Sequence, residues 1–350
     1  MTQQTKTERN IGLWLALSAF MVFMMMIIGA ITRLTESGLS MVEWRPFIGW
    51  IPPIGVEEWT RVFELYKQTS EYQLANFGMS LEEFQNIFWW EYIHRVWGRM
   101  IGIVYGLPFF WFLLRGQIPK GYKRHFTALL LLGGFQGVIG WWMVKSGFVD
   151  RTDVSQYRLA THLGVAFLIL GYLIWVMLDF LAPIEQGRKA VQRSFRRVGA
   201  MAHAVIFFTA ISGALVAGLG AGRVFNDWPF MDGEFFPNGY FWRDPWWINF
   251  FETVQSVQFN HRSMAYLTAI VIIWLWIASK RHDLAPRAKN AINALFGMLI
   301  LQIALGISTL MLAVPMHLAV THQAGAAITF ALSIWVMKEL RGQSASYFDK

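Results

Sequence analysis

Long apolar runs without a charged side chain constrain the fold of this chain more than any other feature of its sequence. A helix needs about 20 apolar residues to cross the hydrocarbon core of a bilayer. The last run is long enough for two spans, which we expect to be separated near Pro315, so the sequence predicts eight membrane-spanning helices. The runs cover residues 11–32, 100–114, 126–144, 159–178, 198–222, 263–279 and 290–337.

The overall composition agrees with an all-α integral membrane protein. Hydrophobic residues make up 55% of the 350 residues and charged residues only 15%, which is too apolar for an ordinary soluble domain. The net charge of +8 requires no nucleic-acid partner, because basic loops that face the anionic lipid of a bilayer account for it. The absence of cysteine excludes disulfides, cysteine-bound iron–sulfur clusters and covalently attached c-type haem.

Lysine and arginine collect in alternate connecting segments, which predicts the orientation. The segments 115–124, 181–197 and 280–289 carry four, five and four of them, whereas the intervening segments 145–157 and 315–317 carry two and none. Cytoplasmic loops carry the excess of positive charge. Both termini are therefore predicted to be cytoplasmic, and the N-terminus has the pattern of an uncleaved signal anchor in a bacterial inner (plasma) membrane.

The chain contains an internal repeat. Once the halves are aligned on their histidines, residues 136–140 match residues 302–306, and Gly29-Ala30 matches Gly213-Ala214. Four spans return a chain to the side on which it started, so each half is expected to form a four-helix bundle of the same orientation. We predict two tandem bundles related by a pseudo-twofold axis along the membrane normal. They comprise residues 1–185 and 186–350, with 181–197 as the linker.

Four histidines occupy matching positions near the predicted outer ends of their spans. His94 and His162 lie in the first half, and His261 and His322 lie in the second. An ionisable ring inside a span is costly and usually marks a functional site. Histidine is also a common axial ligand of haem iron. The pattern predicts one non-covalent bis-His haem in each bundle, with a proton relay or transporter site as the chief alternative.

The remaining four histidines do not share this pattern. His125 and His282 lie beside basic residues in predicted cytoplasmic segments, where a solvated surface role is expected. His317 lies in the tight outer turn after Pro315 and has no counterpart in the first half. His203 lies within a span, where a hydrogen-bonded core role is the expectation.

The repeat is broken next to the first ligand histidine. Glu91 precedes His94 by three residues, and the equivalent position before His261 is Gln258. A spacing of three places each side chain on the same helix face as its histidine. Oxidation of a C–H bond needs a group that moves protons or stabilises positive charge, so the first half is the candidate reaction chamber. An i,i+4 ion pair between Glu91 and Arg95 is the alternative role for this carboxylate.

Several arginines lie near the outer ends of the predicted spans. Guanidinium groups bind carboxylates in bidentate fashion, so these residues are candidate partners of haem propionates. Extension of the side chains to the membrane interface is the alternative. The candidates are Arg33, Arg95, Arg99, Arg223 and Arg262.

The outer segment 33–87 is too polar for a span and is rich in Trp, Phe and Pro, so we expect it to fold over the first site. Together with the stretches around the four histidines, its opening residues closely resemble haem A synthase, in the alpha-proteobacterial and mitochondrial branch of that family. The resemblance extends over essentially all eight spans. The stretches that carry it are residues 32–46, 91–95, 160–164, 259–262 and 321–323.

The resemblance implies a definite chemistry. Members of this family oxidise the C8 methyl group of haem O to a formyl group through successive hydroxylations, which yields the haem A of cytochrome oxidase. His94 and His162 match the substrate-haem positions, His261 and His322 match the resident haem b positions, and Glu91 matches the catalytic glutamate. Some bacterial members carry a cysteine pair in the first outer loop, which this chain lacks.

The expected partners follow from the same resemblance. Without a flavin or dinucleotide fingerprint, the chain needs an external electron donor. Haem O synthase and cytochrome oxidase assembly factors are further expected partners, and homo-oligomers are known in the family. Two competing functions remain at this stage, namely a bis-His cytochrome b that only transfers electrons and a non-enzymatic haem carrier.

Overall fold

The computed structural model describes residues 5–44, 49–148, 153–184 and 188–342. Eight of its helices are long and apolar enough to cross a membrane, which confirms the predicted number of spans. These helices are α1 (Lys6–Leu34), α4 (Leu81–Leu114), α5 (Tyr122–Lys145), α6 (Gln156–Leu181), α7 (Arg193–Gly218), α9 (Val254–Ser279), α10 (Pro286–Met311) and α11 (Met316–Arg341). The short helices are α2 (Gly55–Lys67), α3 (Ser70–Leu74), η1 (Ser146–Phe148), η2 (Ala221–Arg223), η3 (Trp246–Ile248) and α8 (Asn249–Glu252).

The helix boundaries follow local sequence signals. Ser80 caps α4 and exchanges hydrogen bonds with Glu83, so the helix begins well before the apolar run that starts at residue 100. The helix α9 likewise begins at Val254, ahead of its apolar run. Pro315 precedes the first residue of α11 and separates it from α10, as predicted. His94 and His261, the candidate ligands of α4 and α9, therefore lie inside continuous helices.

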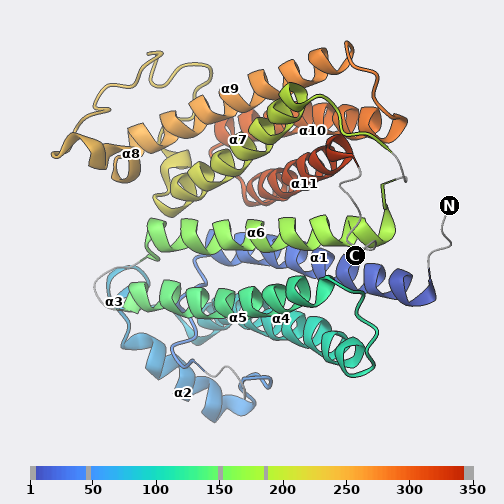
Figure 1. The fold of residues 1–350 in the computed structure, drawn as a ribbon. Coiled ribbons are helices and arrows are strands. Elements are labelled where there is room, and N and C mark those ends of the chain that lie inside the picture. The colour runs from blue at the N-terminus through green and yellow to red at the C-terminus, as the bar shows by residue number, and fades with distance from the viewer. Residues whose placement is uncertain (1–4, 45–48, 149–152, 185–187, 343–350) are drawn as a thin grey trace.

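The two halves have the same pattern of helix contacts. In the first half α1 packs against α4 and α6, and α5 packs against α4 and α6. In the second half α7 packs against α9 and α11, and α10 packs against α9 and α11. Figure 1 shows the halves as two layers that meet along α1 and α6 on one side and α7 and α11 on the other. This pattern agrees with tandem bundles, while the pseudo-twofold axis itself stays a prediction.

The interface between the halves is closely packed. Phe167 of α6 meets Phe330 of α11 edge to face, with ring centroids 5.1 Å apart. Gly171 leaves room for Ile334, since a Cβ atom at position 171 would stand 2.9 Å from Cδ1 of that side chain. Small residues at such contacts allow membrane helices to approach each other. The halves are thus joined by a continuous apolar core.

The linker is fastened to the ends of the spans. Glu339 of α11 is 1% exposed and forms ion pairs with Arg188 at 2.7 Å and with Arg287 at 2.8 Å. Arg287 also donates a hydrogen bond to the carbonyl of Ala182 after α6. These contacts hold both halves together at the end of the molecule where α1 begins and α11 ends (Figure 1). The predicted boundary at residues 185 and 186 lies outside the described residues.

The outer segment folds over α4, as expected. Aromatic rings of α2 pack on the first turns of α4, with centroids 4.9 Å apart for Phe63 and Phe84 and 5.1 Å apart for Tyr66 and Phe84. Figure 1 places α2, α3 and α8 at the same end of the molecule, opposite the beginning of α1. We call residues 35–80 the lid, because the structure assigns Arg33 to α1 and residues 81–87 to α4.

Candidate functional site

The four predicted histidines form two pairs, one in each half. His94 of α4 and His162 of α6 are electrostatic neighbours in the first half, and His261 of α9 and His322 of α11 are electrostatic neighbours in the second. The last three lie about two turns after the first residue of their helices. His94 lies deeper along its helix because the outer turns of α4 belong to the region under the lid. All four rings are at the lid end of the spans.

A glycine of a neighbouring helix packs against each of the four rings. In every case a Cβ atom on the glycine would come within about van der Waals contact, or closer, of Cε1 of the imidazole. The distances are 3.1 Å for Gly29 and His94, 3.2 Å for Gly140 and His162, 3.0 Å for Gly213 and His261, and 2.9 Å for Gly306 and His322. Sequence reasoning did not assign a role to these glycines, although all four lie in the segments that the repeat aligns.

Hydrogen bonds orient the rings from the Nδ1 side. Ser212 Oγ lies 2.9 Å from Nδ1 of His261, and Thr32 Oγ1 lies 3.5 Å from Nδ1 of His94. Gln302 Nε2 lies 3.2 Å from Nδ1 of His322 and donates to the carbonyl of the same residue. Nδ1 of His162 is buried without a hydrogen-bond partner. The second-half rings are thus held by closer polar contacts than those of the first half.

The arrangement fits iron ligation by two imidazoles. The hydrogen bonds of His94, His261 and His322 to neighbouring side chains involve Nδ1 of each ring. The hydroxyl oxygens of Thr32 and Ser212 can accept from Nδ1–H of His94 and His261, and a ring that donates in this way presents the Nε2 lone pair to a metal. The described residues contain no cluster of three or more His, Cys, Asp or Glu that could hold a bare metal ion. Haem iron, which takes four ligands from its macrocycle, requires only the two imidazoles.

Glu91 lies at the centre of a buried polar network between α4 and the lid. Its side chain is 3% exposed. Oε2 accepts hydrogen bonds from Ser40 Oγ at 2.8 Å and from the Met41 backbone N–H at 2.6 Å. Oε1 pairs with the guanidinium of Arg95, which also donates to the carbonyls of Met41 and Glu43. The ion pair considered as the alternative role of Glu91 is therefore present in the structure.

The second half repeats this network without the carboxylate. Arg262 donates to the backbone carbonyls of Phe225, Asp227 and Phe230, which follow η2. Gln258 donates to the carbonyl of Phe225 at 2.8 Å, and its own Oε1 is buried without a partner. In both halves, an arginine of the helix that carries the first histidine therefore donates hydrogen bonds to backbone carbonyls of an outer segment. Within the described part of the chain, only the network of the first half contains a buried acid.

The candidate propionate partners have mixed surroundings. Arg95 and Arg262 are engaged by the outer segments, as described. Arg33 donates to the carbonyl of Ala217 at 3.2 Å and lies 3.6 Å from Asp153, so it bridges α1 and α7. The exposed Arg223 lies 3.9 Å from Glu36 across the two halves. The propionate roles of all these arginines stay predictions.

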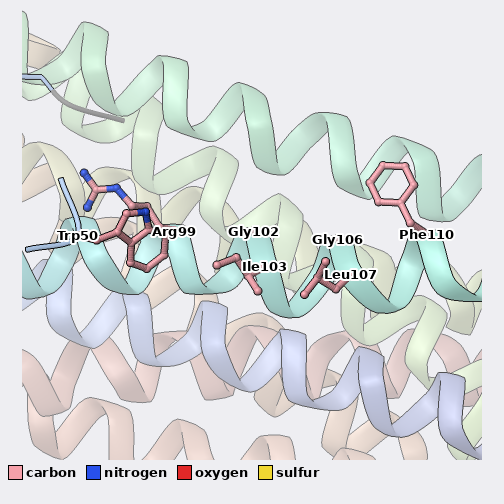
Figure 2. A pocket seen from close by; sticks show the side chains of 7 residues that line it. All are labelled: Trp50, Arg99, Gly102, Ile103, Gly106, Leu107 and Phe110. Atoms are coloured by element: carbon pink, nitrogen blue, oxygen red, sulfur yellow. The ribbon is translucent and has the colours of Figure 1, made fainter. Parts of the chain in front are cut away.

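Two apolar grooves run along α4 and α6, the helices that carry His94 and His162. One, of about 390 Å³, follows a single face of α4 from Arg99 to Phe110, with Trp50 of the lid beside Arg99 (Figure 2). The guanidinium of Arg99 lies 5.7 Å from the centroid of the Trp50 ring. The other groove, of about 700 Å³, lies between α6 and α7, and Thr161 and Gly164 of its wall flank His162 along the helix.

The other histidines have structural partners. Nδ1 of His203 lies 2.9 Å from Ser333 Oγ, in the hydrogen-bonded core role that was expected. His125 is half-buried, with Nδ1 2.7 Å from the Tyr172 hydroxyl, and His282 packs on the ring of Phe195, with centroids 4.3 Å apart. These two are therefore less solvated than the sequence suggested. The side chain of His317 is exposed.

The chain is similar to known proteins over nearly its full length. The family described as cytochrome oxidase assembly protein matches residues 12–334. The chain belongs to this family. Three curated relatives are each named heme A synthase, and their organisms are Nitrosospira multiformis (45% identity over 97% of this chain and 96% of the relative), Parvibaculum lavamentivorans (44%, 96% and 96%) and Agrobacterium fabrum (44%, 95% and 91%). The resemblance drawn from the motifs is thereby confirmed over nearly the full length.

Proposed function

We propose that this protein is an oxidoreductase that converts a methyl group of haem O to the formyl group of haem A, by successive hydroxylations, for use in cytochrome oxidase. The observation that carries the proposal is the buried carboxylate of Glu91, three residues before His94, at a position where the second half has an amide. The names of the relatives, heme A synthase, support the same activity.

The two histidine pairs have different roles in this proposal. His94 and His162 hold the substrate haem, in the half that contains Glu91. His261 and His322 hold a resident haem b without covalent attachment, since the chain has no cysteine. When bound, this haem supplies single-electron transfer. The closer polar contacts of its two ligands, from Ser212 and Gln302, suit a permanently held group.

In the reaction, Glu91 either accepts a proton or stabilises a positive charge on the substrate. All of its contacts come from donors, namely Ser40, Met41 and Arg95. These three donors leave about one of the four lone-pair positions of the carboxylate for a proton, and the ionised group can also stabilise a nearby positive charge. The lid closes the network from the outside and limits water at the reacting carbon.

The surroundings of the enzyme are part of the proposal. The distribution of Lys and Arg supports both termini in the cytoplasm and the histidines toward the outer face of a bacterial inner membrane. The groove along α4 is open to lipid and is lined by apolar side chains, which suits the prenyl chain of haem O (Figure 2). Electrons come from an external donor, and haem O synthase and cytochrome oxidase assembly factors are the expected partners.

The test is pigment analysis of membranes that contain the protein and are supplied with haem O. We expect hydroxylated and formyl haem in extracts of the parent, and strongly reduced amounts in Glu91→Gln. The second-half haem should persist in this variant, because Gln258 shows that an amide is tolerated at the equivalent place. Unchanged haems in the parent would favour a cytochrome b or a haem carrier instead. Near-normal conversion by Glu91→Gln would reduce Glu91 to a structural partner of Arg95.

A further inference from the structure

The lid contains a second buried acid that the proposed reaction does not use. Glu71 of α3 is 5% exposed, and its Oε2 has no hydrogen-bond partner. Its other contact is a hydrogen bond with the hydroxyl of Tyr66, which is fully buried and also accepts from Asn76 Nδ2 at 2.7 Å. A buried carboxylate without a cation is strongly disfavoured, so such a group tends to hold a proton.

The position of Glu71 is linked to Glu91 through a short series of contacts. The preceding residue, Ser70, donates to the carbonyl of Gly147 in η1 at 3.2 Å. Gly147 packs against the buried Leu39, since a Cβ atom at position 147 would stand 2.5 Å from that side chain. Leu39 immediately precedes Ser40, which donates to Glu91. The helix α3 is thus seated on the same stretch of lid that holds the Glu91 carboxylate.

The charged groups that face Glu71 are acidic. They are Glu91 from α4, Glu36 after α1, and Asp153 before α6, while α2 contributes Tyr66. Among the described residues, no basic side chain acts on it. Burial raises the pKa of Glu71 to about 8, the hydrogen bond with Tyr66 opposes this effect, and the acidic neighbours add to it.

We propose that Glu71 is a positioning residue for the proton chemistry of Glu91, such that the two buried carboxyl groups share one negative charge. While Glu91 is ionised, Glu71 keeps its proton. When Glu91 takes up a proton during substrate oxidation, Glu71 releases one to water at the outer face, and the reverse exchange restores both groups. One proton is bound and one is released, so the charge under the lid stays constant. This inference rests on the proposed function of Glu91.

The experiment is an infrared pH titration of the purified full-length protein without haem O, with glutamate carboxyl groups labelled by ¹³C. We expect a protonated carboxylic acid band at neutral pH in the parent and in the control Glu82→Gln, which alters an exposed glutamate at the start of α4. The band should be absent in Glu71→Gln. In Glu91→Gln its titration midpoint should fall by about one pH unit, because a like charge has been removed.

A second variant protects the test against a folding defect. Tyr66→Phe removes the hydroxyl that favours the ionised form of Glu71, so the midpoint should rise in this protein. Retention of second-half haem absorbance would show that each variant is folded. A parent protein without the band, or a midpoint that does not respond to Glu91→Gln, would overturn the proposal. Because no substrate is present, either result is independent of whether haem O is converted.

Discussion

Glu91 and Gln258 occupy matching positions, and they differ by a single group that can carry charge. Both lie under an outer segment that is fastened by an arginine, Arg95 in one half and Arg262 in the other. In the first half the arginine forms an ion pair with a carboxylate, and in the second its hydrogen bonds among the described residues go to backbone carbonyls. The residue-level difference therefore changes the charge of a site whose geometry is otherwise repeated.

Gln258→Glu should reproduce the acidic network in the second half. The new carboxylate would lie beside Arg262 and fill the place of the unpartnered Gln258 Oε1. A negative charge near the proposed resident haem would stabilise its oxidised state, so we expect a lower midpoint potential with haem content unchanged. A redox titration followed by optical absorbance measures this. An unchanged or raised potential would show that the new group is neutral or distant from the haem. Glu91→Gln is the control, because it should leave the midpoint potential of the second-half haem unchanged.

Glu71 should make the stability of the protein depend on pH. Burial raises its pKa to about 8, whereas an unfolded glutamate titrates near pH 4.3. The folded state therefore binds a proton that the unfolded chain releases, and its stabilising effect is complete below about pH 4.3 and is lost as pH rises toward about 8. Glu71→Gln removes this dependence. Its thermal midpoint in detergent should exceed that of the parent by a margin that grows between these limits, as the difference in the free energy of unfolding rises to the order of a few kcal/mol.

At the level of helices, each of the four imidazoles packs against a glycine of a neighbouring helix. Gly306 of α10 lies so close to His322 that any side chain displaces the ring. Gly306→Ala should therefore weaken or abolish retention of the second-half haem, with a packing cost of roughly 1–3 kcal/mol. Gly297→Ala is the matched control, because this glycine of α10 has no neighbour within 4 Å of its added Cβ. Equal haem content in both variants would contradict the role of the contact.

The helices α2 and α3 of the lid can be removed to test whether the lid protects Glu91. Replacing residues 55–79 by a short flexible linker removes α2 and α3 and leaves the spans intact. We expect haem A formation to fall strongly, because Glu91 would become open to water and its donors Ser40 and Met41 would no longer be held in place. Absorbance of the second-half haem should remain. If both properties were lost together, the segment would be needed for folding as a whole.

The spans, the histidine pairs and the acidic asymmetry could be predicted from the sequence, because each depends on residue type and spacing along one helix. The partners of each ring could not, since they depend on which helices become neighbours. Gly140 shows the difference: the repeat marks it as special, but only the packing of α5 against α6 places it on His162. The short helices α2 and α3 were also missed, because the sequence showed only a polar segment rich in aromatic residues.

At the scale of the whole molecule, one hydrogen bond links the surroundings of the two sites. Gln323, next to His322, donates from Nε2 to the carbonyl of Met26 in α1 at 2.8 Å. Gly29, one turn further along α1, packs on His94. In the first half the equivalent residue, which follows His162, is Leu163. Its side chain cannot donate a hydrogen bond, so it cannot make the corresponding contact to the second half. The hydrogen bond from Gln323 adds a polar contact to the apolar interface that sets the relative position of the two histidine pairs.

Gln323→Met keeps the size of this side chain but cannot donate a hydrogen bond. We expect both halves to remain packed, because their interface is large and apolar. Both pairs should still bind haem, while reoxidation of the reduced second-half haem in the presence of haem O becomes slower. Stopped-flow absorbance measures this rate. An unchanged rate would mean that the contact has no part in communication between the sites.

The length of α4 has a mechanical consequence. A single helix from Leu81 to Leu114 extends over about 50 Å, and it carries the aromatic platform of the lid, Glu91 and His94 in succession. A continuous helix is stiff, so its outer turns cannot tilt without moving the imidazole below them. The turns of α4 that contact the lid and the turn that carries His94 are therefore expected to move together. In the proposed function, admission of haem O and release of haem A would then be coupled to the making and breaking of a bond to His94.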